Sequence, residues 1–147
     1  MTGAGAAALG RTTPSGFRLS VRVYYEDTDA GGVVYYANYL KYLERARTEW
    51  LRAIGPDQRD LARDGGVVFA VRSIELEYHA PARLDDVLEV EAEVAAFGRA
   101  RIDFAQRVCR DGRELCGGRV RVACLDAATF RPRPLPVELK EVFARDD

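Results

Sequence analysis

The chain has 147 residues, of which 48% are hydrophobic and 31% are charged, and its formal net charge is −1. A single domain of this size buries a hydrophobic core without disulfides or metals to support it. The balance of 22 Lys and Arg against 23 Asp and Glu lacks the basic excess of general nucleic-acid binders. No apolar run approaches the roughly 20 residues that span a bilayer, so we expect neither a nucleic-acid partner nor a transmembrane segment.

The first 16 residues are dominated by Gly, Ala, Ser, Thr and Pro. They lack the basic start and the continuous apolar stretch of a secretory signal peptide, and the first basic residue is Arg11. We therefore expect a disordered leader over residues 1–16 and a single domain over residues 17–147. The absence of a signal pattern predicts a cytoplasmic location.

One strand and one long helix are predicted at the start of this domain. Polar and apolar residues alternate over residues 17–23, which is the periodicity of a strand. Residues 39–54 carry a single apolar stripe of helical spacing, with Asn38 as the expected N-cap and Gly55-Pro56 as the stop signal. The stripe consists of Leu40, Leu43, Ala46, Trp50 and Ile54.

Four further strands follow, because apolar and polar residues alternate over residues 67–78, 87–94, 101–110 and 119–125. Asp111-Gly112 lies between the last two and predicts a hairpin turn. A helix with one apolar stripe must bury that stripe on a sheet. The order therefore predicts an α+β fold in which a five-stranded antiparallel sheet curls around one helix. The open edge strands favour a dimer that continues the sheet.

The most unusual segment is residues 24–38, which place two acids and two glycines between a strand and a helix. Glycines permit close approach of a ligand, and the start of a helix presents free N–H groups. A carboxylate at such a place can act as a nucleophile or base, while an N–H group holds a developing oxyanion. The same residues also suit a capping Asp in a glycine-rich loop. The pattern alone leaves both interpretations open, as well as the choice between Asp27 and Asp29.

Residues 22–54, 77–86 and 131–136 resemble the 4-hydroxybenzoyl-CoA thioesterase family, in particular its branch of acyl-CoA thioesterases associated with the Tol–Pal system. The long string from Asp27 to Tyr35, Asp-Thr-Asp-Ala-Gly-Gly-Val-Val-Tyr, carries most of the resemblance. The family implies the hotdog fold and the hydrolysis of a short-chain or aromatic acyl-CoA to free acid and CoA. It implies no metal or other cofactor, a homodimer or homotetramer, and a functional link to the Tol–Pal system.

The resemblance also assigns the site. It implies that Asp29 is the catalytic carboxylate, acting as nucleophile or general base, and that the backbone N–H of Tyr36 polarises the thioester carbonyl. Gly31, Gly32 and Val33 are implied to contact the substrate. The Tol–Pal-associated branch usually has His where this chain has Tyr36, so a His-assisted mechanism does not carry over.

Arginines are the expected contacts for the phosphates of CoA, because the guanidinium group binds phosphate in a bidentate manner. Arg99 and Arg101 lie in a turn between two strands, near the position where the family contacts the nucleotide end of CoA. The alternative for each, and for Arg119, is a solvated strand face.

Other reactive residue types are expected to be structural. His79 is the single histidine, and there is no Cys-x-x-Cys pair, so the sequence predicts no metal site. Glu44 flanks the apolar stripe of the helix; another hotdog branch uses a helix Glu, but here Asp29 already supplies the carboxylate. The three cysteines have no neighbouring base in sequence and are expected to be inert: Cys109, Cys116 and Cys124.

Two alternative functions remain open. A hotdog dehydratase acting on hydroxyacyl thioesters would want a His in the active loop, and residues 24–38 contain none. A non-catalytic acyl-CoA-binding or scaffold protein would bind the same ligand without turnover.

Overall fold

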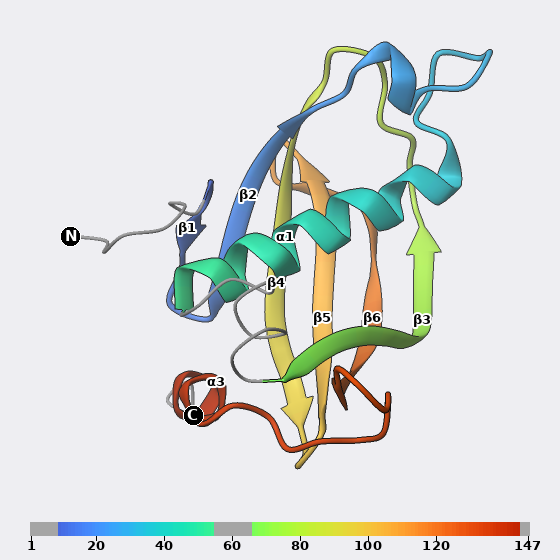
Figure 1. Ribbon diagram of the computed structural model, residues 1–147. Helices are drawn as coiled ribbons and strands as arrows, with labels where there is room; N and C mark the ends of the chain where they lie inside the picture. The colour runs from blue at the N-terminus through green and yellow to red at the C-terminus, as the bar shows by residue number, and fades with distance from the viewer. Residues whose placement is uncertain (1–8, 55–65, 145–147) are drawn as a thin grey trace.

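The structure of the chain is a computed structural model that describes residues 9–54 and 66–144. Its elements follow the order strand, helix, strands that the periodicity predicts (Figure 1). They are β1 (Arg11–Thr12), β2 (Gly16–Arg22), η1 (Tyr25–Asp27), η2 (Tyr36–Asn38), α1 (Tyr39–Ile54), β3 (Val67–Tyr78), β4 (Val87–Phe97), β5 (Arg101–Arg110), β6 (Arg113–Asp126) and α3 (Val137–Ala144). None of the helices in the described part of the chain is long and apolar enough to cross a membrane.

All strands belong to one antiparallel sheet with the order β1-β2-β4-β5-β6-β3. Helix α1 lies across one face of this sheet (Figure 1). Its Tyr42, Leu43 and Trp50 are almost completely buried, and the Trp50 ring meets the ring of Phe104 on β5 at a centroid distance of 6.0 Å. The expected α+β architecture of a sheet around one long helix is confirmed.

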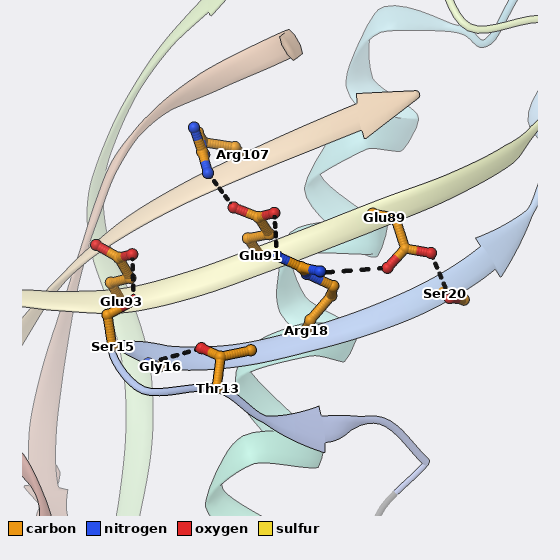
Figure 2. Close-up of polar contacts among 9 residues, drawn as sticks. All are labelled: Thr13, Ser15, Gly16, Arg18, Ser20, Glu89, Glu91, Glu93 and Arg107. Atoms are coloured by element: carbon orange, nitrogen blue, oxygen red, sulfur yellow. Dashed lines mark hydrogen bonds and ion pairs between the residues drawn. The ribbon is translucent and has the colours of Figure 1, made fainter. Parts of the chain in front are cut away.

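The opposite face of the sheet is charged. Figure 2 shows the outward-facing acids of β4, which are Glu89, Glu91 and Glu93. Arg18 of β2 lies 3.2 Å from Glu91 and 4.0 Å from Glu89, and Arg107 of β5 pairs with Glu91 from the other side. Exposed ion pairs of this kind add little stability. The face without a helix is therefore polar along the middle of β4, whereas Leu88, Val90 and Ala92 of the same strand are buried on the other face.

The sheet has six strands rather than the expected five. The additional strand is β1, whose Arg11 and Thr12 pair with Arg18 and Phe17 of β2. The expectation of a disordered leader is thus wrong for the part of it that forms this hairpin, whereas residues 1–8 lie outside the described residues. A strand of two residues is too short to produce an alternating pattern, which is why the composition of residues 1–16 did not reveal it.

The strands β4 and β6 are longer than expected, and one short helix is additional. Strand β4 continues to Phe97 past an irregularity between Val94 and Ala96, and β6 begins at Arg113 rather than at residue 119. Gly117-Gly118 interrupts the alternation of polar and apolar residues in β6, so the alternation did not predict the part of the strand before residue 119. Helix α3 was not expected, because its eight residues bury only two apolar side chains, Leu139 and Phe143.

The hairpin between β5 and β6 confirms the turn predicted from Asp111-Gly112. Both residues have positive φ, 52° for Asp111 and 81° for Gly112. A two-residue hairpin turn with positive φ at both positions matches the twist of the strands, and Asp-Gly tolerates that conformation.

Strand β3 is the last strand of the sheet and pairs only with β6. The two strands approach closely at Gly118, which lies opposite Leu76. A Cβ atom on Gly118 would lie 1.8 Å from the backbone carbonyl oxygen of Glu75. Position 118 therefore requires glycine for the close approach of the two backbones.

Gly118→Ala is expected to lower the free energy of unfolding by about 2 kcal/mol or more, because backbone atoms of β3 must shift to admit a methyl group. Gly117→Ala is the matched control, since a Cβ there meets only the flexible end of the Glu114 side chain. Urea denaturation followed by circular dichroism measures both. Equal stabilities of the two variants would contradict the close backbone contact.

Candidate active site

The loop between β2 and α1 contains a tight turn that projects from one end of the sheet (Figure 1). Thr28 and Val34 form an isolated antiparallel bridge, and the Asp29 N–H donates to the Val33 carbonyl at 2.9 Å. The chain reverses at Gly32, whose φ is 80°. A Cβ atom added to Gly32 would meet no other atom within 4 Å. Gly32 is thus required by backbone conformation, not by crowding.

Asp29 is exposed at the start of this turn. Its Oδ1 accepts a hydrogen bond from the Gly31 N–H at 2.8 Å, and in the described part of the chain no group binds its Oδ2. A Cβ atom on Gly31 would lie 3.3 Å from that Oδ1 and would crowd it. One oxygen of the carboxylate is therefore held in place while the other remains available to a ligand.

Asp27 has the opposite environment, although it is only two residues away. Its side chain is buried; Oδ2 accepts the Tyr24 N–H at 2.9 Å and Oδ1 accepts the Asn38 amide at 3.0 Å. Burial opposes ionisation, but these hydrogen bonds, the nearby Tyr42 hydroxyl and the charge of Arg45 outweigh it, and the pKa of Asp27 is lowered. Its stabilising effect is present at neutral pH and is lost as the pH falls through its lowered pKa.

Asn38 therefore does not have the role that its position suggested. Its side chain binds Asp27, and the short helix η2 stands between the turn and the first residue of α1. The Asp27 carbonyl also accepts the Tyr35 N–H at 3.0 Å. Through these contacts Asp27 joins both ends of the loop that carries Asp29.

Tyr36 begins η2, so its N–H has no acceptor within that helix. Its carbonyl accepts a hydrogen bond from the Tyr78 hydroxyl at 3.0 Å, and its ring meets those of Tyr35 and Tyr78 at centroid distances of 4.8 and 6.4 Å. The Tyr36 side chain itself is 64% exposed. The backbone of Tyr36 is thus fixed from β3, while its phenol faces the surroundings of the loop.

The predicted arginines lie at the other end of the sheet. Arg99 and Arg101 border the turn between β4 and β5, where they line a hollow of about 470 Å³. Arg72 of β3 also lines it, and none of the lining residues is acidic. Arg101 is 3.4 Å from Asp103 and is thereby partly neutralised. The complete lining is Ala70, Arg72, Arg99, Ala100, Arg101, Ala123, Leu125 and Pro132.

Arg72 was missed by the sequence reasoning. It sits where the register between β3 and β6 shifts, between Val71 and Ser73. The one available signal was a charged residue that interrupts the apolar run of residues 67–71. The face of the sheet to which Arg72 belongs depends on this register shift, which is a β-bulge that the periodicity of the sequence does not reveal.

A single chain does not bring the turn and the arginines together. Val33 forms a bridge with Arg83 and the Val34 N–H binds Ala82 at 2.8 Å, so the turn lies just before the start of β4. Arg99 follows the end of β4, whose 11 residues span about 35 Å at a rise of about 3.3 Å per residue. The turn that carries Asp29 and the β4–β5 turn that carries Arg99 therefore lie at opposite ends of β4, and Figure 1 shows these two loops at opposite ends of the sheet.

A second, larger hollow of about 600 Å³ lies between α1 and β2. It reaches Asp27 but not Asp29, and its charged lining residues are four arginines and four acids. Because these charges balance, the hollow has no preference for an anionic group such as a phosphate. The charged residues are Arg11, Arg18, Arg22, Arg45, Glu26, Asp27, Glu49 and Glu89.

The remaining candidates have structural contacts. His79 Nε2 lies 3.0 Å from Glu114 on the surface, a partner that sequence spacing did not indicate. Glu44 accepts a hydrogen bond from the Thr48 hydroxyl at 2.9 Å. Burial raises the pKa of each cysteine thiol, to about 12 for Cys116, so these thiols are poor nucleophiles at neutral pH.

Residues 23–143 match the family model of the thioesterase-like superfamily. The acyl-CoA thioesterase YbgC of Haemophilus influenzae is 46% identical over 129 residues, which cover 88% of this chain and 95% of that protein. The acyl-CoA thioester hydrolase YbgC of Escherichia coli is 45% identical over 128 residues, covering 86% and 95%. The crystal structure of a probable thioesterase from Bartonella henselae superposes with a TM-score of 0.76 at 33% identity, covering 81% of this chain and 98% of that one.

Proposed function

Since this chain belongs to the thioesterase-like superfamily, we propose that it is an acyl-CoA thioester hydrolase in which Asp29 is the catalytic carboxylate. The sheet wrapped around α1 is the hotdog fold expected for this family. The activity is supported by relatives that are acyl-CoA thioesterases and share nearly half of their residues with the chain. The role of Asp29 is supported by one observation above all: it has a free carboxylate oxygen, whereas both oxygens of Asp27 are occupied.

The reaction needs two groups at the thioester carbonyl. Asp29 either attacks the carbonyl carbon directly or removes a proton from a water molecule that does so. The negative charge that develops on the carbonyl oxygen is held by the N–H of Tyr36 at the start of η2. Collapse of the tetrahedral intermediate breaks the C–S bond and releases the CoA thiolate, which takes up a proton. If Asp29 attacks directly, water then hydrolyses the mixed anhydride to regenerate the carboxylate.

The surroundings of Asp29 favour a short-chain or aromatic acyl group. The ring of Tyr36 meets those of Tyr35 and Tyr78 beside the turn, and all three residues are exposed. Such rings offer an aromatic acyl group both stacking and edge contacts. Gly31, Gly32 and Val33 form the rest of the turn and would lie against the substrate.

A complete site requires a second copy of the chain. The outer edge of β3 has no neighbour among the described residues, and its Val71, Ile74 and Tyr78 are 46%, 37% and 47% exposed. Pairing of this edge with the same edge of another copy continues the sheet. The protein is therefore a dimer, or a tetramer built from such dimers, in our proposal.

The antiparallel geometry of that pairing brings the two halves of the site together. A two-fold axis near the middle of β3 sets Tyr78 of one copy opposite Val67 of the other. At one end of β3, the Tyr78 hydroxyl donates to the Tyr36 carbonyl. In the other half of β3, Arg72 lines the hollow that also contains Arg99. CoA then reaches from Asp29 of one copy to the arginine hollow of the other, where its phosphates bind.

The cellular setting belongs to the same proposal. We place the enzyme in the cytoplasm, as predicted above from the sequence, and in functional connection with the Tol–Pal system, a link that rests on the resemblance of the motif around Asp29. Neither changes the chemistry that the site performs.

Asp29→Asn is expected to lower kcat by about 10²-fold or more, because the amide is neither a nucleophile nor a base. The release of free thiol from a panel of acyl-CoA substrates measures it. Asp27→Asn is the matched control; it should reduce kcat less, and should lower the free energy of unfolding by about 1–3 kcal/mol because an amide has one acceptor oxygen and cannot accept both the Tyr24 N–H and the Asn38 amide. Near wild-type turnover in Asp29→Asn would refute the assignment.

Tyr36→Phe is expected to lower kcat less than about tenfold, because the backbone N–H that holds the oxyanion survives, whereas loss of such a donor costs about 10²–10³-fold. Steady-state kinetics with one good acyl-CoA substrate measures the change. A decrease beyond a hundredfold in a folded variant would transfer the role to the phenol. Tyr36→His would then test whether an imidazole can replace it.

Arg72→Ala and Arg99→Ala are each expected to raise KM for acyl-CoA more than they lower kcat, because a phosphate contact is equal in ground and transition states. The effect should shrink for the acyl-pantetheine substrate, which lacks the nucleotide. Arg11→Ala on β1, outside this hollow, is the charge-matched control. Equal penalties on both substrates would remove these arginines from the CoA site.

A further inference from the structure

Arg47 of α1 is a buried cation without an acidic partner among the residues that the structure describes. Only 8% of the residue is exposed, and its Nη1 donates to the Gln106 oxygen at 2.9 Å. Gln106 is neutral, and its own amide nitrogen donates to the Leu43 carbonyl at 3.0 Å, which fixes its oxygen toward Arg47. No carboxylate of the described residues forms an ion pair with Arg47. Burial accordingly lowers the pKa of the guanidinium, opposed only by the charge of Glu44.

Such an arrangement is unfavourable for a charged group. A single hydrogen bond to a neutral amide does not replace the hydration that the guanidinium has lost. Arg47 also retains N–H donors that Gln106 does not use, because a guanidinium has five. A carboxylate from outside the chain would supply both the missing charge and the missing acceptors.

The surroundings of Arg47 open toward the free edge of the sheet. Arg47 lines a cavity of about 110 Å³ between α1 and the sheet, together with Glu44 one turn earlier and Leu51 one turn later. These residues share one face of the helix because they are spaced by three and four positions. On the sheet side the cavity is bordered by Phe69 and the exposed Val71 of β3, the edge strand.

A second copy paired along β3 presents the same face of its own α1 to this cavity. Both helices then lie on the same side of the continued sheet and run antiparallel, since a two-fold axis relates them. In a two-fold contact, if residue i of one copy contacts residue j of the other, then residue j of the first copy contacts residue i of the second. A face with an acid and a base one turn apart is therefore complementary to itself in charge.

We propose that Glu44 of a second copy is the missing partner of Arg47, so that two reciprocal Glu44–Arg47 ion pairs form across the two-fold axis. This inference rests on the dimer of the proposed function and specifies how its helices meet. It also gives Glu44 a role other than catalysis. The dimer then neutralises a charge that the isolated chain leaves buried.

Glu44→Gln is the first test, because Glu44 is exposed and the variant keeps the fold. Sedimentation equilibrium should show that its dimer Kd rises about a hundredfold, because the variant loses both reciprocal pairs and each is worth about tenfold at the lower end of the range for close interfacial charge pairs. Glu49→Gln on the other side of the same helix makes the same chemical change beside Arg52 and should leave the dimer Kd within about twofold of wild type. An unchanged Kd in Glu44→Gln would overturn the inference.

A rescue in trans provides the second test. Glu44→Arg and Arg47→Glu homodimers each oppose like charges and should dissociate, whereas a mixture of the two variants restores both pairs in a heterodimer. Circular dichroism establishes that each variant is folded; if Arg47→Glu does not fold, the Glu44→Gln comparison decides. Absence of a heterodimer between folded variants would contradict the reciprocal pairs.

The outcomes separate this inference from the function on which it rests. A monomeric wild-type protein would overturn both the dimer and the ion pairs. A dimeric wild type whose Kd is unaffected by Glu44→Gln, but whose KM for acyl-CoA changes, would assign the cavity to the acyl group and overturn the ion pairs alone.

Discussion

The buried carboxylate of Asp27 organises the site on which the rest depends. The carboxylate accepts hydrogen bonds from the Tyr24 N–H before the turn and from the Asn38 amide after it. The backbone carbonyl of Asp27 accepts a third hydrogen bond, from the Tyr35 N–H. A charged group that is buried and fully hydrogen-bonded has few alternative arrangements, so the loop it closes is held in one conformation. Because Asp27 makes the hydrogen bonds that close the loop, Asp29 keeps one carboxylate oxygen without a partner among the described residues, as the proposed catalytic role requires.

The second constraint is the length of the sheet. The turn with Asp29 lies at one end of β4, and the arginine hollow lies at the other. No rearrangement of side chains bridges that distance within one chain. The proposed dimer overcomes this separation, because antiparallel pairing about the middle of β3, whose outer edge has no neighbour among the described residues, exchanges the two ends. In the proposed dimer the same operation brings the α1 faces together and gives Arg47 a carboxylate that the described residues of its own chain do not supply.

The distribution of charge over the two faces of the sheet agrees with this assembly. The face away from α1 is covered by the ion pairs of Arg18 and Arg107 with the acids of β4 (Figure 2). That face is stable in water as it stands. Exposed apolar residues lie instead on the edge strand β3, at Val71, Ile74 and Tyr78, and no carboxylate of the described residues pairs with Arg47 on α1.

The sequence by itself determined the local elements and the chemistry of the motif. Alternation and helical spacing located α1 and β3 to β6, and the string from Asp27 to Tyr35 identified the family, because both depend only on neighbouring residues. The short strand β1, the helix α3 and the role of Asn38 were decided by tertiary contacts that leave no periodic trace. The difference between Asp27 and Asp29 was decided in the same way, since burial depends on where Tyr42 and Asn38 arrive from α1 and η2. Arg72 joined the arginine hollow only because β6 and the β4–β5 turn fold beside it, and the distance of that hollow from Asp29 exists only in three dimensions.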